Sequence, residues 1–169
     1  HLAQLTGGCQ VAAQVHYVRF PSTNDRVAID WVRATQLIVD SGTTVVVTPP
    51  ADRGGAGAVV GWRLVSDNHR EIARGSRLHP SERAAGFEAA TLARAAQELV
   101  VHAARQHMTR TSRWFATLDN LVVLVGSRAY ENRVTARNAG ALAVRSLAAL
   151  GALPAADPSS MPHSGEPTT

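Results

Sequence analysis

Two acidic dipeptides, Asp67-Asn68 and Asp119-Asn120, are the residues whose types and spacing most directly suggest acid–base chemistry. If the two aspartates met in the folded chain, they could form a paired-carboxylate active site. Asp and Asn also adopt positive φ readily and bond to their own backbone, which suits them to tight hairpin turns. Because each dipeptide stands between two apolar segments with β-forming residues, we predict turns here rather than a catalytic pair.

A second set of polar side chains could build a small-molecule or catalytic site between the two segments. It comprises Asp67, Ser76, His79 and Ser127. The chain contains no Walker loop, no Gly-x-Gly-x-x-Gly motif and no His-Glu-x-x-His motif, so we expect no cofactor.

His102 and His107 are the pair to consider as metal ligands. On the helix predicted for this region, a five-residue step separates two side chains by about 140°, so they would not bind one ion. No cysteine or acidic cluster joins them, and we predict no metal site. Cys9, the only cysteine, could act as a nucleophile with His16 as its base, but a lone cysteine near a terminus more often has no catalytic role.

Many of these residues recur because the chain contains an internal repeat. The segments 62–79 and 114–130 share Trp, Asp-Asn, an aliphatic residue four places after the Asn, and Gly-Ser-Arg. The first copy has one extra residue before Gly-Ser-Arg and ends in a histidine where the second has a tyrosine. Two of the three tryptophans occupy matching positions, so the repeat is expected to be the framework of the fold. The residues that carry it are Trp62, Asp67, Asn68, Gly75, Ser76, Arg77, Trp114, Asp119, Asn120, Gly126, Ser127, Arg128 and Tyr130.

Each copy predicts a β-hairpin, formed by strands 62–66 and 69–75 in the first copy and by strands 114–118 and 121–126 in the second. The strand 121–126 is apolar on both faces, so it should lie centrally in a sheet or meet a partner. In each copy, Gly-Ser-Arg should mark the end of the second strand. Glycine would free the backbone, serine would bond locally, and the following His or Tyr would pack beneath the turn. By this interpretation the repeated tripeptide is scaffold.

A helix is predicted after each hairpin. The first begins after Ser81, an N-cap residue, and a stripe of small side chains carries it to about residue 107. The second begins after Asn132 and runs to about residue 150. Residues 1–50 lie outside the repeat and predict a strand at 11–20, a helix at 25–40 capped by Asn24, and a strand at 43–48.

The spacing of Trp114, Asn120, Leu124, Ser127 and Tyr130 resembles the pattern of the YegP-like family, which comprises small bacterial proteins of uncharacterised function. The resemblance covers residues 58–150. The family usually has glycine after the asparagine, where both copies here have another residue, and the first helix region of this chain is longer. The resemblance implies tandem units of three strands, a helix and a strand, joined in one sheet, with exchange of terminal strands and assembly into dimers. It implies no catalytic residues.

We therefore predict an α+β fold in which two tandem β-hairpin–helix repeats form a shared antiparallel sheet with their helices packed on one face. The predicted organisation is a β-α-β-like extension at 1–50, a Gly-rich linker at 51–57, one YegP-like repeat at 58–109, a second at 110–153 and a disordered tail at 154–169.

The charge composition is unusual in kind, because all 17 basic residues are arginines, while the formal net charge is only +4. Arginine suits phosphate recognition, but an arginine bias along a whole chain is more often the result of a GC-rich genome. No apolar run approaches the roughly 20 residues that span a bilayer. With a single cysteine and no apparent signal peptide, a cytoplasmic bacterial protein is expected. The arginines considered for nucleic-acid contact are Arg63, Arg70, Arg74, Arg77 and Arg113.

Three functions are considered, in order of preference. The first is a non-enzymatic module that forms homodimers or binds a protein partner through its sheet. The second is an arginine-based nucleic-acid-binding module, which requires those five arginines to converge on one face. The third is a small-molecule site between the repeats, which requires a pocket that contains the polar groups named above. No membrane association is predicted.

Overall fold

The computed structural model describes residues 13–39 and 57–151, which form a six-stranded antiparallel sheet and three α-helices. The predicted α+β fold with an antiparallel sheet is confirmed at this level. Cys9, the predicted strand at 43–48, most of the linker and the tail lie outside the described residues. The elements are β1 (Ala13–Phe20), α1 (Arg26–Val39), β2 (Val59–Ser66), β3 (Glu71–Gly75), α2 (Glu82–Arg94), the 3-10 helix η1 (Ala96–Glu98), β4 (Val100–Arg105), β5 (Ser112–Leu118), β6 (Leu121–Gly126) and α3 (Arg133–Gly151).

The sheet consists of two three-stranded halves that meet edge to edge. Its strand order is β1-β2-β3-β6-β5-β4, so β3 and β6 form the seam between the halves. At the middle of the seam Arg74 pairs with Val125. β1, from the predicted N-terminal extension, pairs with β2 along its whole length and completes one edge of the sheet.

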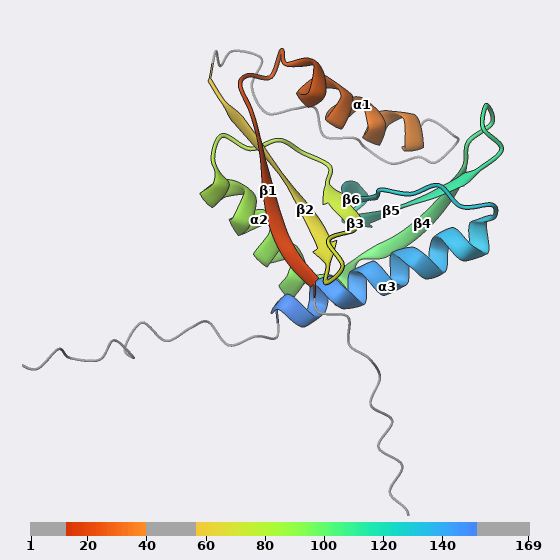
Figure 1. The fold of residues 1–169 in the computed structure, drawn as a ribbon. Coiled ribbons are helices and arrows are strands. Elements are labelled where there is room, and N and C mark those ends of the chain that lie inside the picture. The colour runs from red at the N-terminus through yellow and green to blue at the C-terminus, as the bar shows by residue number, and fades with distance from the viewer. Residues whose placement is uncertain (1–12, 40–56, 152–169) are drawn as a thin grey trace, which may run out of the picture.

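The helices cover both faces of the sheet (Figure 1). α2 and α3, which follow the two hairpins, pack together on one face, as predicted for them. α1 lies across the opposite face, where Trp31 contacts β2 at Gly61 and Ile38 packs among residues of β4, β5 and β6. We call these surfaces the α2/α3 face and the α1 face. Within the two described ranges, none of the helices is long and apolar enough to cross a membrane.

The core on the α2/α3 face is built around two tryptophans at matching positions of the repeat. Trp62 and Trp114 are both buried, and each indole lies against a glycine of the neighbouring strand, Gly75 or Gly126. A Cβ built on either glycine would come within 2.4 Å of the indole Nε1. Neither glycine has a positive φ, so the prediction that glycine frees the backbone here is wrong. These glycines are needed because a ring occupies the space of their side chain.

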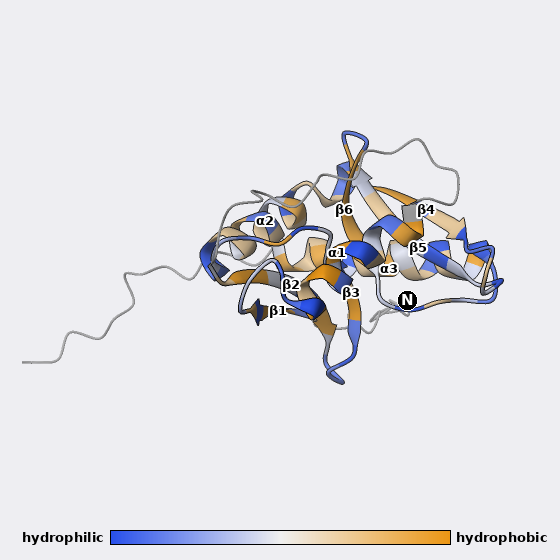
Figure 2. Cartoon of the chain, turned by 90° about the horizontal axis from the view of Figure 1, so that it is seen from above, coloured by the Kyte–Doolittle hydropathy of each residue, from blue (hydrophilic) through white to orange (hydrophobic). Residues whose placement is uncertain are grey.

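The core on the α1 face holds the N-terminal helix in place. Trp31 packs edge-on against Phe20, with ring centroids 5.6 Å apart, and its Nε1 donates a hydrogen bond to the Gly75 carbonyl at 3.0 Å. Seen from the α1 side, apolar residues follow the strands, while the turns that end the hairpins are hydrophilic (Figure 2).

Strand β6 is buried from both sides, as its apolar composition predicted. Leu124 is buried on the α2/α3 face. Val122 and Val125 pack with Ile38 and Phe115 on the α1 face. The chain therefore covers its most apolar strand with its own N-terminal helix.

The prediction that the first helix continues to about residue 107 is wrong for the second half of that segment. α2 ends at Arg94, and Val100–Arg105 form the edge strand β4, which pairs with β5. The small-residue stripe did not distinguish the two conformations, because Leu99, just before the strand, and Ala103, within it, contact the same core. The consecutive β-branched residues Val100 and Val101 favour a strand and are the local signal for it.

The two hairpin turns differ. Asp119 and Asn120 both adopt positive φ, 50° and 64°, as a two-residue type I′ turn requires. In the first hairpin the residue with positive φ is His69, at 58°, and β3 begins at Glu71 rather than at residue 69. The first hairpin therefore has the wider turn.

Side-chain caps begin all three α-helices that the structure describes. The Asn132 carboxamide oxygen accepts the Thr135 backbone N–H at 2.8 Å, and the Ser81 hydroxyl accepts that of Ala84 at 3.1 Å. Both caps were predicted. At α1 the cap is Asp25 rather than Asn24, since its carboxylate accepts the backbone N–H groups of the second and third following residues.

Replacing Gly126 by alanine should lower the free energy of unfolding by about 1–3 kcal/mol, because the new methyl group would overlap the buried indole of Trp114. The measurement is a urea denaturation curve for each protein. The matched control is Gly57→Ala, since nothing lies within 4 Å of a Cβ at that position. Equal unfolding midpoints for the two variants would contradict the assigned role of Gly126.

Candidate functional site

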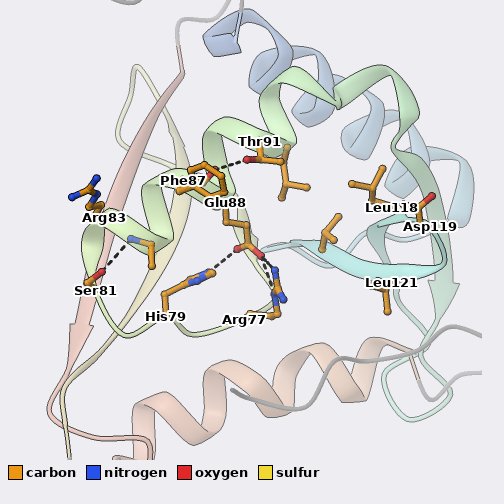
Figure 3. Close-up of a pocket in the computed structure, with 13 residues that line it drawn as sticks. Arg77, His79, Ser81, Arg83, Phe87, Glu88, Thr91, Leu118, Asp119 and Leu121 are labelled. Carbon is orange, nitrogen blue, oxygen red and sulfur yellow. Dashed lines mark hydrogen bonds and ion pairs between the residues drawn. The ribbon is translucent and has the colours of Figure 1, made fainter. Parts of the chain in front are cut away.

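The candidate site is a cleft of about 700 Å³ between helix α2 and the β5–β6 hairpin, which we call the α2 cleft (Figure 3). It brings together residues from both halves of the sheet. Arg77, His79 and Glu88 lie at one end, near the segment that joins β3 to α2, apolar side chains line most of the remainder, and Asp119 lies beside Leu118 at the other end. The lining residues are Arg77, His79, Ser81, Arg83, Ala84, Phe87, Glu88, Thr91, Leu92, Leu118, Asp119, Leu121 and Val123.

A buried carboxylate organises the charged end of the cleft. Glu88 is only 7% exposed, and both of its oxygens accept hydrogen bonds. Oε1 accepts Nε and Nη2 of Arg77 at 2.9 and 2.6 Å. Oε2 accepts Nε1 of Trp62 at 2.8 Å and lies 2.7 Å from Nε2 of His79. An ionised carboxylate only accepts, so that histidine nitrogen carries the hydrogen.

The fold brings Glu88 to its donors through helix periodicity. Ala85, Glu88, Ala89 and Leu92 form the buried side of α2. A carboxylate on such a side requires partners, because burying an unpaired charge is costly. Gly75 allows the Trp62 indole to lie deep enough to supply one of them.

The electrostatics of this group favour its charged form. Burial by itself would raise the pKa of Glu88, but the hydrogen bonds from His79, Trp62 and Arg77 outweigh burial and hold the pKa below its ordinary range. Glu88 is therefore ionised at neutral pH and balances the charge of Arg77.

The remainder of the cleft is apolar and open. Phe87 is 71% exposed, and Leu121 on the opposite wall is also exposed. Leu118 and Val123 complete that wall, from strands β5 and β6. The exposed ring of Phe87 has no core to fill, so it is available to another molecule.

The charged network occurs in only one half of the sheet. In the second copy of the repeat, Trp114, Arg128 and Tyr130 stand at the positions of Trp62, Arg77 and His79. On α3, Gly140 packs under the Trp114 ring, and Ala139 stands where the repeat register would place a counterpart of Glu88. The second half therefore has the tryptophan and the glycine without the carboxylate.

The prediction that the two repeat serines bond locally is wrong. Both serines connect the two halves of the sheet. The Ser76 hydroxyl donates to the Val122 carbonyl at 2.7 Å. The Ser127 hydroxyl donates to Oε1 of Glu71 at 2.6 Å. Neither serine lines the α2 cleft, whereas His79 does.

The aspartates of the two turns are not brought together. Asp67 and Asn68 are in the turn between β2 and β3, while Asp119 and Asn120 are in the turn between β5 and β6. The antiparallel register of β3 against β6 puts these turns at opposite ends of the seam. Of the four, only Asp119 lines the cleft.

His102 and His107 are not on a helix. His102 is in β4, where its ring stacks on Phe115 with centroids 4.9 Å apart and its Nε2 lies 2.9 Å from Oγ1 of Thr117. Burial lowers the pKa of His102, and the positive charge of Arg137 lowers it further. His107 is exposed in the loop between β4 and β5.

The five arginines considered for nucleic-acid contact are divided among three places. Arg63, Arg74 and Arg113 are half-buried on strands β2, β3 and β5. Arg70 is exposed in the turn between β2 and β3, and Arg77 pairs with Glu88.

Glu88 and Phe87 were not among the predicted site residues. The sequence did contain a signal for Glu88, since it is a glutamate on the buried side of a predicted helix.

Comparison of the chain with protein-family models, with curated proteins and with solved structures found no match.

The Glu88→Gln variant should be less stable than the wild type by about 2 kcal/mol at pH 7, because charge-assisted hydrogen bonds are replaced by neutral ones. The folded-state pKa of Glu88 lies below its ordinary value, so its stabilising effect is complete above the ordinary value of about 4.3 and is lost as the pH falls through the folded-state value. The two proteins should therefore converge in stability as the pH falls through the folded-state pKa of Glu88.

The measurement is the free energy of unfolding in urea at several pH values between 3 and 7. Glu98→Gln, which changes an exposed glutamate, is the control and should differ little from the wild type at each pH. A constant difference between wild type and Glu88→Gln at all pH values would show that Glu88 is not a stabilising charge.

Proposed function

We propose that this protein is a non-enzymatic binding module that holds an apolar segment of a protein partner in the α2 cleft. The observation that carries the proposal is the pair of exposed apolar side chains on opposite walls of the cleft, Phe87 and Leu121, beside a fully paired ionic network. Large exposed apolar side chains gathered in a concave surface are typical of interaction sites.

The distribution of charge in the cleft supports a protein partner. Glu88 neutralises Arg77 inside the cleft, while Arg83 and Ser81 are exposed. An apolar centre with polar groups around it is the usual arrangement of a protein interface. The sheet takes part through the β5–β6 hairpin, since the described helices cover both of its faces.

The hydrogen bonding of the polar groups supports a binding role rather than a catalytic one. Glu88 accepts four hydrogen bonds and has no free oxygen with which to take a proton from a substrate. Ser76 and Ser127 use their hydroxyls to connect the halves of the sheet. His79 is held by the carboxylate that it contacts, which favours a positioning role.

We further propose that the chain consists of two YegP-like copies, β1-β2-β3-α2 and β4-β5-β6-α3, with α1 inserted in the first. In support, His79 forms an isolated bridge with Val60, and Tyr130 forms one with Ser112. The tryptophan–glycine contacts also occur at matching positions. This division assigns β4 to the second copy, so the boundary falls before residue 100 rather than at 109–110. Under this division, only the first copy contributes the charged end of the α2 cleft.

A small molecule is the second candidate occupant of the cleft. A volume of about 700 Å³ lies within the range of roughly 300–1,000 Å³ that drug-sized ligands occupy. His79 and Arg77 at its charged end could then orient a polar group of that ligand.

A photoreactive benzoylphenylalanine placed at position 87 should form a cross-link to one defined protein, either a second copy of the chain or a separate partner. The control is the same residue at position 134, because Val134 on α3 is 70% exposed, as Phe87 is 71% exposed. Cross-linked products identified by mass spectrometry should appear at position 87 only.

Phe87→Ala should also weaken the association by at least about tenfold, as loss of a central aromatic contact does in many interfaces. Its folding should not change, since the ring is mostly in solvent. Cross-linking of equal yield at positions 87 and 134, or at neither, would reject the cleft as a protein-binding site. A small ligand that binds wild type but not Phe87→Ala would then support the second candidate.

A further inference from the structure

Three arginines converge on the α1 face of the sheet. Side chains alternate along a strand, so Arg63 and Arg113 point away from the neighbouring Trp62 and Trp114, which belong to the α2/α3 core. Arg74 is directly opposite Arg63 in the pairing of β2 with β3. Its guanidinium lies 4.8 Å from the ring centroid of Trp31, which places it on the α1 face.

One carboxylate, that of Glu71, lies among these cations. Oε2 of Glu71 is 3.6 Å from Nη1 of Arg63, and its Oε1 is 4.0 Å from Nε of Arg74. The same Oε1 accepts the hydroxyl of Ser127 at 2.6 Å. Both ion-pair distances are long for charge-assisted hydrogen bonds, which are usually about 2.7–2.9 Å. Glu71 therefore only partly satisfies the two arginines.

Donor groups in this cluster are left without acceptors. Nε of Arg63 and Nε of Arg113 are both buried, and neither has a hydrogen-bond partner among the residues that the structure describes. A buried donor without an acceptor is costly, and such groups in a folded protein call for an explanation. A bound anion would supply the missing acceptors.

The charge balance also favours an anion. Among the described residues, Arg63, Arg74 and Arg113 contribute three positive charges, and the carboxylate that pairs with Arg63 and Arg74 is that of Glu71. Burial lowers the pKa of Arg74, Glu71 opposes that effect, and the positive charge of Arg113 adds to it. Arg74 and Arg113 thus lie close enough together for each charge to disfavour the other.

We propose that Arg63, Arg74 and Arg113 form a binding site for a tetrahedral oxyanion, either free phosphate or the phosphate group of a small phosphorylated ligand. Guanidinium groups present paired donors that match phosphate oxygens, and several forks around one centre can satisfy all of them. The site is open to solvent on one side, since the side chain of Arg63 is 41% exposed and that of Arg74 is 21% exposed.

A single bound anion fits this site better than a nucleic-acid strand does. A strand requires a stripe of positive charge along the surface, whereas Arg70 and Arg77 do not extend this cluster. Trp31 of α1 stacks on Arg74 and fills one side of the site. The oxyanion site is on the face opposite α2, and its argument does not depend on the α2 cleft.

The test is a calorimetric titration of the full chain with inorganic phosphate, at an ionic strength held constant with chloride. Saturable binding with one phosphate per chain is expected. Arg113→Gln and Arg63→Gln should each weaken that binding by at least about tenfold, the effect of losing a charge-assisted hydrogen bond. Arg70→Gln removes the same charge from the exposed turn and should bind phosphate as the wild type does.

Glu71→Gln provides a variant with a gain of binding. It removes the competing negative charge while keeping an oxygen that can accept the Ser127 hydroxyl, so phosphate should bind about tenfold more tightly. If the cluster were only a structural ion pair, Glu71→Gln would show no phosphate binding, and the proposal would fail.

Two further titrations distinguish a phosphorylated ligand from free phosphate and test for nucleic-acid binding. A phosphate monoester such as glycerol phosphate that binds more tightly than inorganic phosphate would assign the site to a phosphorylated ligand, and the reverse order would assign it to the free ion. Binding of a single-stranded oligonucleotide alone, weakened as much by Arg70→Gln as by Arg113→Gln, would instead show a general basic surface and overturn the proposal.

Discussion

Contact between an indole ring and a glycine is the constraint on which both halves of this sheet depend. Trp62 and Trp114 are too large to be buried between sheet and helix unless the neighbouring strand gives them space, and Gly75 and Gly126 provide it. The contact also determines what can follow each strand. In the first half, the position of the indole directs its N–H toward Glu88, so a packing requirement becomes the basis of an ionic network. In the second half, Gly140 packs under the ring and no equivalent acid is present, so the same packing produces only core.

Local patterns of the sequence predict much of this architecture. Apolar segments with β-forming residues on either side of Asp-Asn identify both hairpins, and Ser81 and Asn132 identify two helix starts, because these signals act over a few residues. β4 was missed because its small residues suit the same core from either a helix or a strand. The pairing with β5 decides between them, and the local sign of a strand is limited to the two residues Val100 and Val101.

The candidate site was less accessible to prediction than the fold. The donors of Glu88 come from residues 26, 11 and 9 positions away in sequence, and the opposite wall of the cleft comes from the other half of the sheet. The sequence indicates His79 as a possible site residue and Arg77 as a possible nucleic-acid contact, but nothing in it indicates that both bind one carboxylate. The arginines show the same limit, because a count of 17 arginines does not indicate which three lie together on the α1 face. That meeting depends on strand register and on α1, which covers the face opposite the other helices.

The serine bonds across the seam have a consequence for how the chain folds. Ser76 reaches a carbonyl 46 residues further along the chain, and Ser127 reaches a carboxylate 56 residues back. Each half therefore supplies the acceptor for the other's hydroxyl, and neither is complete alone. Joining β3 to β6 closes a long loop, whose entropic cost is recovered only once both hairpins exist. We expect the hairpins to form early and the seam late, so that the α2 cleft and the oxyanion site, which both draw on the two halves, appear together in the last step of folding.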